Sequence, residues 1–94
     1  MANVTLHDEA LEEFRQATRW YELRTPGVGE RYSDAVEKMV VEVGEHPDRY
    51  PKYDRVFREA GTAGYPYRVL PSGDVQVIAV AHASRAPGYW RDRA

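Results

Sequence analysis

The chain has 94 residues, of which 43% are hydrophobic and 30% charged, with a formal net charge of -2. These values describe one globular domain, residues 1–94, and exclude a disordered or fibrous protein. The absence of cysteine excludes disulfides, thiolate chemistry and cysteine-based zinc sites. No secretory signal is visible, and no segment approaches the ~20 apolar residues of a membrane helix. We therefore expect a cytoplasmic protein that does not contact membranes.

The net charge hides an uneven distribution along the chain. Residues 1–45 contain ten acidic and five basic side chains, a balance of -5, whereas residues 46–94 contain five acidic and eight basic ones, a balance of +3. A solvated acidic helical face accounts for the first half. Seven of the eight cations in the second half are arginine, which suits bidentate contact with phosphate or carboxylate. The basic half is where we expect a partner to bind.

The first half of the chain predicts a short strand and two helices. Val4–Leu6 has the pattern of a strand, and Asp8 is a suitable N-cap for a helix that runs to about Leu23. The turn Thr25–Gly27 leads into a second helix over about Val28–Val43, which a C-cap glycine then ends. Two helices joined by so short a turn form an antiparallel hairpin, and their shared apolar face needs a sheet to cover it.

The apolar period changes from 3.6 to 2 after a loop at residues 45–55. Strands are expected at about Val56–Glu59, Tyr65–Leu70 and Val75–His82, and the turn Pro71–Asp74 joins the last two. Both faces of the last strand are apolar, so it is expected to be central. The sequence thus predicts an α+β fold: a two-helix antiparallel hairpin packed on a small, mostly antiparallel four-stranded sheet, in the order β-α-α-β-β-β, with a short C-terminal tail.

Strict alternation assigns the side chains of the last two strands to faces. In the last strand it predicts one face with Val75, Val77, Ala79 and Ala81, and the other with Ile78, Val80 and His82. In the strand before it, Arg68 is expected on the face opposite Tyr65, Tyr67 and Val69.

Cations and aromatic side chains gather at the end of the last strand and on its neighbours. They are Arg58, Arg68, His82, Arg85, Tyr89, Trp90, Arg91 and Arg93. Arginines stabilise charge on phosphate oxygens, histidine and tyrosine transfer protons, and aromatic rings stack on bases. Such a set suits cleavage of RNA by its own 2′-hydroxyl, which requires no metal and no cofactor.

A different arrangement of the same residues leaves no such site. Tyr89 and Trp90 would fold back onto the sheet as a lid, and the arginines Arg68 and Arg85 would pair with nearby acidic residues. The candidate acidic partners are Asp54, Glu59 and Asp92. A metal centre is not expected under either arrangement, because the three histidines lie on different elements and no pair has ligand spacing.

Two segments of the second half carry a family resemblance. They are Gly64–Val69, with its Tyr-Arg-Val, and Ile78–Trp90, which contains His-x-x-Arg-x-Pro-x-Tyr-Trp. With the order of elements above, the chain resembles the RelE/ParE superfamily of toxins from bacterial type II toxin–antitoxin systems, which include plasmid stabilisation proteins. The resemblance implies a cytoplasmic toxin of this fold, neutralised in a hetero-oligomer by an antitoxin that wraps over it.

The branches of this superfamily differ in their target. RelE-like toxins cleave messenger RNA on the ribosome, whereas ParE-like toxins inhibit DNA gyrase without being enzymes. Arg68 and Tyr89 match positions of the RelE-like nucleases, but the lysines of the preceding strand have no counterpart, because Arg58 and Glu59 stand there. The resemblance therefore favours gyrase inhibition over RNA cleavage. An inactive relative that acts as a binding or regulatory module is the third alternative.

A nuclease and a binding protein would use different sets of residues. As a nuclease, the protein would use Arg68, His82, Arg85 and Tyr89 as catalytic residues, and Glu59 and Arg58 are secondary candidates. As a binding protein, it would contact its target or its antitoxin through Arg58, Arg85, Tyr89, Trp90, Arg91 and Arg93. If the antitoxin covers the rim of the sheet, Trp90 is expected to be a buried anchor of that complex.

Overall fold

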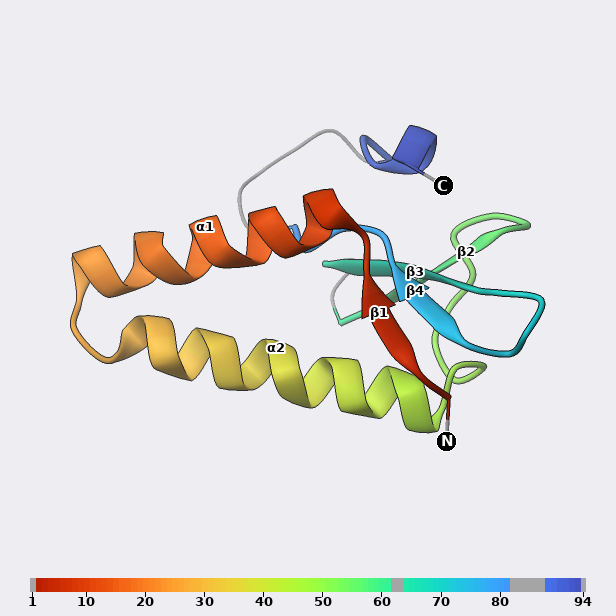
Figure 1. Cartoon of the computed structure of the whole chain (residues 1–94), viewed down its shortest axis with the longest axis horizontal. Helices are drawn as coiled ribbons and strands as arrows, with labels where there is room; N and C mark the ends of the chain where they lie inside the picture. The colour runs from red at the N-terminus through yellow and green to blue at the C-terminus, as the bar shows by residue number, and fades with distance from the viewer. Residues whose placement is uncertain (1, 62–63, 82–87, 94) are drawn as a thin grey trace.

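The computed structural model describes residues 2–61, 64–81 and 88–93. Its elements are β1 (Val4–Leu6), α1 (Asp8–Arg24), α2 (Val28–Glu45), β2 (Phe57–Ala60), β3 (Tyr65–Val69), β4 (Val75–Val77) and the 3-10 turn η1 (Arg91–Arg93). The helices form an antiparallel hairpin whose open end packs on a four-stranded sheet, while the hairpin turn projects well beyond it (Figure 1). The predicted α+β fold is confirmed. None of the described helices is long and apolar enough to cross a membrane.

Helix α1 begins one residue earlier than an N-cap at Asp8 would place it. The cap is His7, whose Nδ1 accepts the N–H of Glu9 at 3.1 Å. Asp8 instead lies in the first turn, where a negative charge stabilises the positive end of the helix dipole. The helix ends at Arg24, and the N–H of Thr25 still bonds the carbonyl of Tyr21.

The two helices approach each other closely at Gly29 of α2. A Cβ atom at this position would lie 2.6 Å from the carbonyl oxygen of Thr18, so a larger residue would push the helices apart. The carboxylate of Glu22 accepts hydrogen bonds from the N–H groups of Gly27 at 2.9 Å and Gly29 at 3.1 Å. α1 thereby satisfies donors at the N-terminus of α2 and locks the hairpin turn.

Helix α2 continues to Glu45 instead of ending at Val43. The predicted C-cap, Gly44, is a buried residue inside the helix. A Cβ atom there would lie 2.8 Å from Val4 Cγ2 of β1, so this glycine lets the helix pack against the edge strand. A glycine is required at this position, but the reason is close packing against β1 and not the end of the helix.

The strands of the sheet are arranged in the order β1-β4-β3-β2. β1 pairs parallel with β4, with Val4 opposite Val75, and the other pairs are antiparallel. β4 is therefore central, as both of its apolar faces predicted, and the N-terminal strand lies at an edge.

β4 ends at Val77, five residues before its predicted end at His82. The next residue, Ile78, donates its N–H to the carbonyl of Pro66 at 2.8 Å, but Pro66 has no N–H to return to Ile78. Further along, Ala81 bonds Gly64, which shifts the pairing by one residue. One extra residue thus stands on the β4 side, as in a β-bulge.

This shift overturns the strict alternation predicted beyond Val77. Val80 joins the apolar cluster of Val77 on the helix side, whereas Ala79 packs with Ile78 on the other side. Ala79 was predicted with Val77, and Val80 with Ile78, so both placements were wrong. The predicted face of Arg68 is confirmed, because it stands opposite Phe57 and away from the buried Tyr67. His82 lies outside the described residues.

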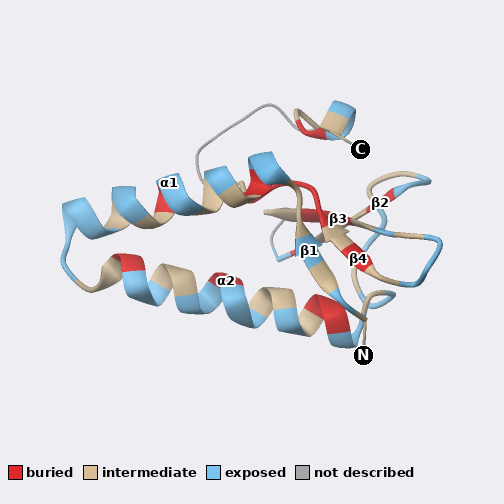
Figure 2. Cartoon of the chain, viewed as in Figure 1, coloured by how far each residue is buried: buried red, intermediate tan, exposed pale blue. Residues whose placement is uncertain are grey.

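The chain has two apolar clusters, one on each side of the sheet. The larger lies between the helices and the sheet and contains Ala10, Val43, Ala60, Tyr67, Val75, Val77 and Val80. The smaller lies on the outer face and contains Phe57, Ile78, Ala79 and Trp90. Figure 2 shows buried residues concentrated in the sheet and at isolated positions along the helices. The outer cluster exists because the end of the chain returns to the sheet.

Candidate functional site

The C-terminal segment, residues 88–93, lies against the outer face of the sheet beside the first turns of α1 (Figure 1). Its anchor is Trp90, which is only 2% exposed. The indole packs edge-on against Phe57 and Tyr53, with ring centroids 4.8 Å and 5.0 Å away. Trp90 therefore adopts the arrangement in which the aromatic residue folds back onto the sheet.

A single carboxylate, Glu13 of α1, holds the polar side of this segment. It accepts four hydrogen bonds: from Tyr89 Oη at 2.8 Å, from Arg93 Nη1 and Nη2 at 2.9 Å and 3.0 Å, and from the N–H of Val80 at 3.0 Å. The side chains of Glu13 and Arg93 are 11% and 14% exposed. Burial alone would raise the pKa of Glu13, but the hydrogen bonds from Arg93, Tyr89 and Val80 outweigh burial and lower it. Glu13 is therefore ionised and firmly paired at neutral pH.

Arg93 completes the connection between the segment and the sheet. Its Nη1 also donates to the carbonyl of Ile78 at 3.2 Å, and its Nε lies 2.9 Å from Glu9. The Ile78 carbonyl is free for this bond because the facing residue in β3, Pro66, has no N–H. The guanidinium also lies over the ring of Tyr89, 5.1 Å from its centroid. The interruption of the sheet by a proline thus creates the acceptor that the C-terminal arginine uses.

Arg91 is the accessible cation of the segment. Its side chain is 59% exposed and lies 3.7 Å from Asp54, in the loop before β2. Asp54 already accepts the N–H groups of Val56 at 2.8 Å and Phe57 at 2.9 Å, and these bonds lower the pKa of its carboxyl. Arg91 is therefore loosely paired and open to a partner, in contrast to Arg93.

The candidate arginines of the sheet lie on opposite faces. Arg58 stands opposite Tyr67 on the helix side, and its Nη1 donates to the carbonyls of Tyr50 at 2.7 Å and Asp48 at 3.3 Å. Arg68 lies on the outer face, where its Nε donates to Gln76 at 2.9 Å. These two cations cannot act on one phosphate without rearrangement of the sheet.

The other candidates divide between described and undescribed residues. The hydroxyl of Tyr89 is bonded to Glu13. Glu59 lies on β2, and burial raises the pKa of its carboxyl. His82 and Arg85 lie outside the described residues, so their roles stay predictions. Among the described residues, neither Arg68 nor Glu59 forms an ion pair.

Sequence reasoning missed Glu13, although a signal for it exists. It follows Ala10 by three residues and precedes Ala17 by four, and both alanines are buried. An acidic residue in the buried row of a helix needs a partner, because an unpaired buried charge is costly. That partner comes from the far end of the chain, and no local pattern identifies it.

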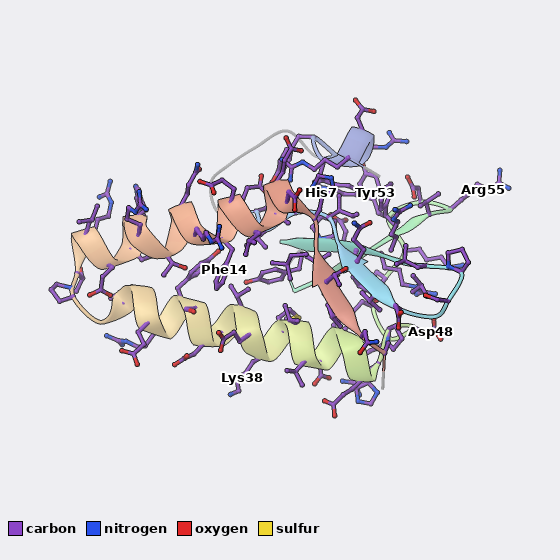
Figure 3. The ribbon with its side chains drawn as sticks, in the orientation of Figure 1. His7, Phe14, Lys38, Asp48, Tyr53 and Arg55 are labelled. Carbon is purple, nitrogen blue, oxygen red and sulfur yellow. The ribbon has the colours of Figure 1, made fainter. Side chains whose placement is uncertain are left out.

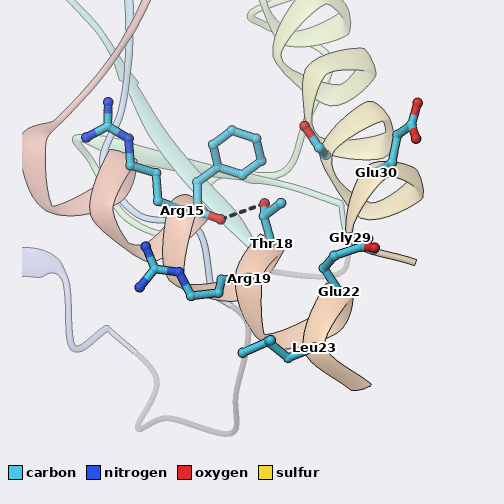
Figure 4. A pocket seen from close by; sticks show the side chains of 9 residues that line it. Arg15, Thr18, Arg19, Glu22, Leu23, Gly29 and Glu30 are labelled. Carbon is cyan, nitrogen blue, oxygen red and sulfur yellow. Dashed lines mark hydrogen bonds between the residues drawn. The ribbon is translucent and has the colours of Figure 1, made fainter. Parts of the chain in front are cut away.

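A second candidate surface lies at the far end of the helix hairpin, beyond the sheet. It is a groove of about 490 Å³ lined by Phe14, Arg15, Thr18, Arg19, Glu22, Leu23, Gly29, Glu30 and Ser33, which we call the interhelical groove. Figure 4 shows Arg15 and Arg19 next to each other on α1. Neither arginine forms an ion pair with any described residue. Leu23 is 80% exposed, so the groove combines apolar surface with available cations.

Comparison with known proteins supports the family resemblance. Residues 4–87 match the family model described as the ParE toxin of the type II toxin–antitoxin system parDE. A search of curated proteins gives no match. The matched range covers every strand and both helices of the fold and ends just before the C-terminal segment. The chain therefore belongs to the ParE family of type II toxins.

Proposed function

We propose that this toxin inhibits bacterial growth in the cytoplasm by binding DNA gyrase, and that a cognate antitoxin neutralises it in a hetero-oligomeric complex. Gyrase inhibition in this form is a binding function and requires no catalytic residues. The observation that carries the proposal is the separation of the nuclease candidates among the described residues.

RNA cleavage needs a cation on the phosphate and a proton donor within hydrogen-bond reach of the reacting oxygens. Arg58 and Arg68 point to opposite faces of the sheet. The hydroxyl of Tyr89, one of the two residues expected to transfer protons, bonds the carboxylate of Glu13 and lies beside Arg93. This division favours a protein that binds its target over one that cleaves RNA.

The C-terminal segment supplies an anchored surface for such binding. Trp90 and Arg93 tie it to the fold, while Arg91 remains exposed beside Asp54. Arginine is common at the centres of protein interfaces because its planar guanidinium forms several directed hydrogen bonds. We therefore place the contact with gyrase at Arg91 and the surface around it.

The antitoxin is assigned to the interhelical groove. Leu23 exposes an apolar side chain there, and Arg15 and Arg19 carry charge that no described residue neutralises. An antitoxin segment with apolar and acidic side chains is complementary to this combination. Trp90, the anchor expected from the sequence, is covered by Phe57 and Tyr53 of its own chain.

Pulse labelling of DNA, RNA and protein synthesis, minutes after induction of the toxin in bacteria, tests the proposal. We expect DNA synthesis to fall first, and the purified protein to inhibit DNA supercoiling by gyrase. An early fall in protein synthesis would instead indicate a ribosome-dependent nuclease. Undisturbed growth without antitoxin would leave only the inactive binding relative.

A further inference from the structure

The C-terminal segment has no regular secondary structure to hold it except the short turn η1. Its attachment has an apolar part and a polar part. The apolar part is the seat of Trp90 on Phe57 and Tyr53. The polar part is centred on Glu13, which bonds both Tyr89 and Arg93. Arg93 also contacts the exposed Glu9 and the carbonyl of Ile78, and Arg91 lies near Asp54. One carboxylate of α1 therefore carries most of the polar attachment.

Glu13 also holds the chain that leads toward the segment. Its Oε1 accepts the N–H of Val80, which lies beyond the end of β4. The same oxygen accepts Nη1 of Arg93 at 2.9 Å, and Nη1 bonds the carbonyl of Ile78. Glu13 thus joins three parts of the molecule: the first helix, the extension of the central strand and the last residues of the chain.

We infer that Glu13 is a positioning residue, whose bidentate pair with Arg93 and bond to Tyr89 hold the C-terminal segment in the place from which Arg91 meets the target. This inference rests on the proposed function, because it assigns the target contact to the segment. Glu13 itself is largely covered and acts through the segment, so it does not touch the target.

The structure explains why the carboxylate of Glu13 is the most important polar contact of the C-terminal segment. Bidentate arginine–carboxylate bonds fix both distance and direction, and both side chains here are largely removed from water. Removal of the negative charge would leave the Arg93 guanidinium with only the exposed carboxylate of Glu9 and one carbonyl. The segment would then be held by the Trp90 seat, by these two contacts of Arg93 and by the exposed pair of Arg91 with Asp54. The loss of a charged partner shifts such an equilibrium about tenfold or more.

Tryptophan fluorescence tests the positioning directly. In a Trp20→Phe background, Trp90 is the sole tryptophan. We expect Glu13→Gln to shift the Trp90 emission to the red and to increase its quenching by acrylamide, while far-UV circular dichroism still reports the helices. The matched control is Glu12→Gln, because Glu12 is exposed and its side chain bonds only Gln16 in the described chain. Emission from Glu13→Gln that is as blue and as protected as in the background protein would overturn the inference.

A second variant keeps the test decisive if Glu13→Gln folds poorly. Arg93→Ala breaks the same pair from the end of the chain, and we expect the same red shift. The double variant Glu13→Gln/Arg93→Ala should show little further shift of the Trp90 emission, because each substitution breaks the same Glu13–Arg93 pair. Fully additive shifts would contradict a shared role.

Growth inhibition separates this inference from the proposed function. We expect Glu13→Gln to lose most of its toxicity and Glu12→Gln to keep it, at equal amounts of folded protein. A Glu13→Gln variant with an undocked Trp90 and full toxicity would overturn the positioning role. A wild-type protein that leaves gyrase and growth untouched would overturn the proposed function, and the fluorescence result would still decide whether Glu13 holds the segment.

Discussion

Two regions of this molecule contain the same kinds of residue but differ in how far these residues are buried and paired. In the C-terminal segment, Trp90 is 2% exposed and Arg93 is paired with Glu13. At the far end of the hairpin, Trp20 is 42% exposed, with the guanidinium of Arg24 4.0 Å above its ring, and Arg19 has no acidic partner among the described residues. The first region stabilises the fold and the second has the character of a binding surface, so residue type alone does not distinguish these roles.

The strongest test of this contrast compares the two tryptophans. Trp90→Ala should lower the free energy of unfolding by about 3–5 kcal/mol, because it removes the buried indole from the outer apolar cluster and leaves a cavity. Trp20→Ala should change it by no more than about 1 kcal/mol, since the side chain is partly in water already. Urea denaturation followed by circular dichroism measures both. Equal losses would show that the two regions do not differ as described.

The next effect concerns the charge that holds the segment. Glu13→Gln should cost about 2 kcal/mol of stability at neutral pH, because hydrogen bonds to a charged group are lost. The pKa of Glu13 is lowered in the folded protein, so its contribution is present above the pKa of the unfolded chain and disappears as the pH falls through the folded value. The difference between wild type and variant should therefore shrink below about pH 4. A difference that is constant from pH 7 to pH 3 would contradict this assignment.

The third prediction concerns the antitoxin and the interhelical groove. The double reversal Arg15→Glu/Arg19→Glu should weaken the antitoxin complex by more than about 1 kcal/mol, because it replaces both cations of the groove with like charges. Isothermal titration calorimetry with the antitoxin measures this. The control is Arg31→Glu, an exposed arginine of α2 that does not line the groove. If the control weakens the complex as much as the double variant, the groove is not the specific site.

The smallest expected effect on stability is at Arg91. This residue belongs to the C-terminal segment, but its exposed side chain resembles the arginines at the far end of the hairpin. Arg91→Ala should change the free energy of unfolding by less than about 0.5 kcal/mol, because an exposed ion pair contributes little. It should nevertheless reduce growth inhibition. Arg55→Ala is the matched control: Figure 3 shows Arg55 extending away from the rest of the chain. Equal toxicity of both variants and wild type would remove the target contact from the segment.

The sequence was sufficient for the elements with strong periodicity. Val4–Leu6 was predicted with the observed bounds, and both helices were placed within two residues of their ends. Apolar spacing of three and four, the short turn and the alternation in β3 are all local patterns, and each is set by neighbours in the chain. The central position of β4 also followed from sequence, because apolar residues on both faces require cover on both sides.

The errors in the fold have a common physical cause. Gly44 was assigned to a helix end, but it is a contact with β1, and β4 ends early because Pro66 of the neighbouring strand lacks an N–H. In both cases the deciding residue lies on another element. A local pattern shows that a glycine or an apolar residue is present. The residue on another element that it contacts is known only from the folded structure.

The sequence by itself determined the α+β order of elements, the antiparallel hairpin and the arginine and aromatic residues available to a partner. The tertiary structure alone decided which of them remain available. Glu13 and Arg93 are far apart in the chain and meet because the last residues return to the first helix. That contact commits Tyr89 and Arg93 to the fold, while Arg91 remains exposed. Exposure and pairing depend on long-range packing, which local spacing cannot encode.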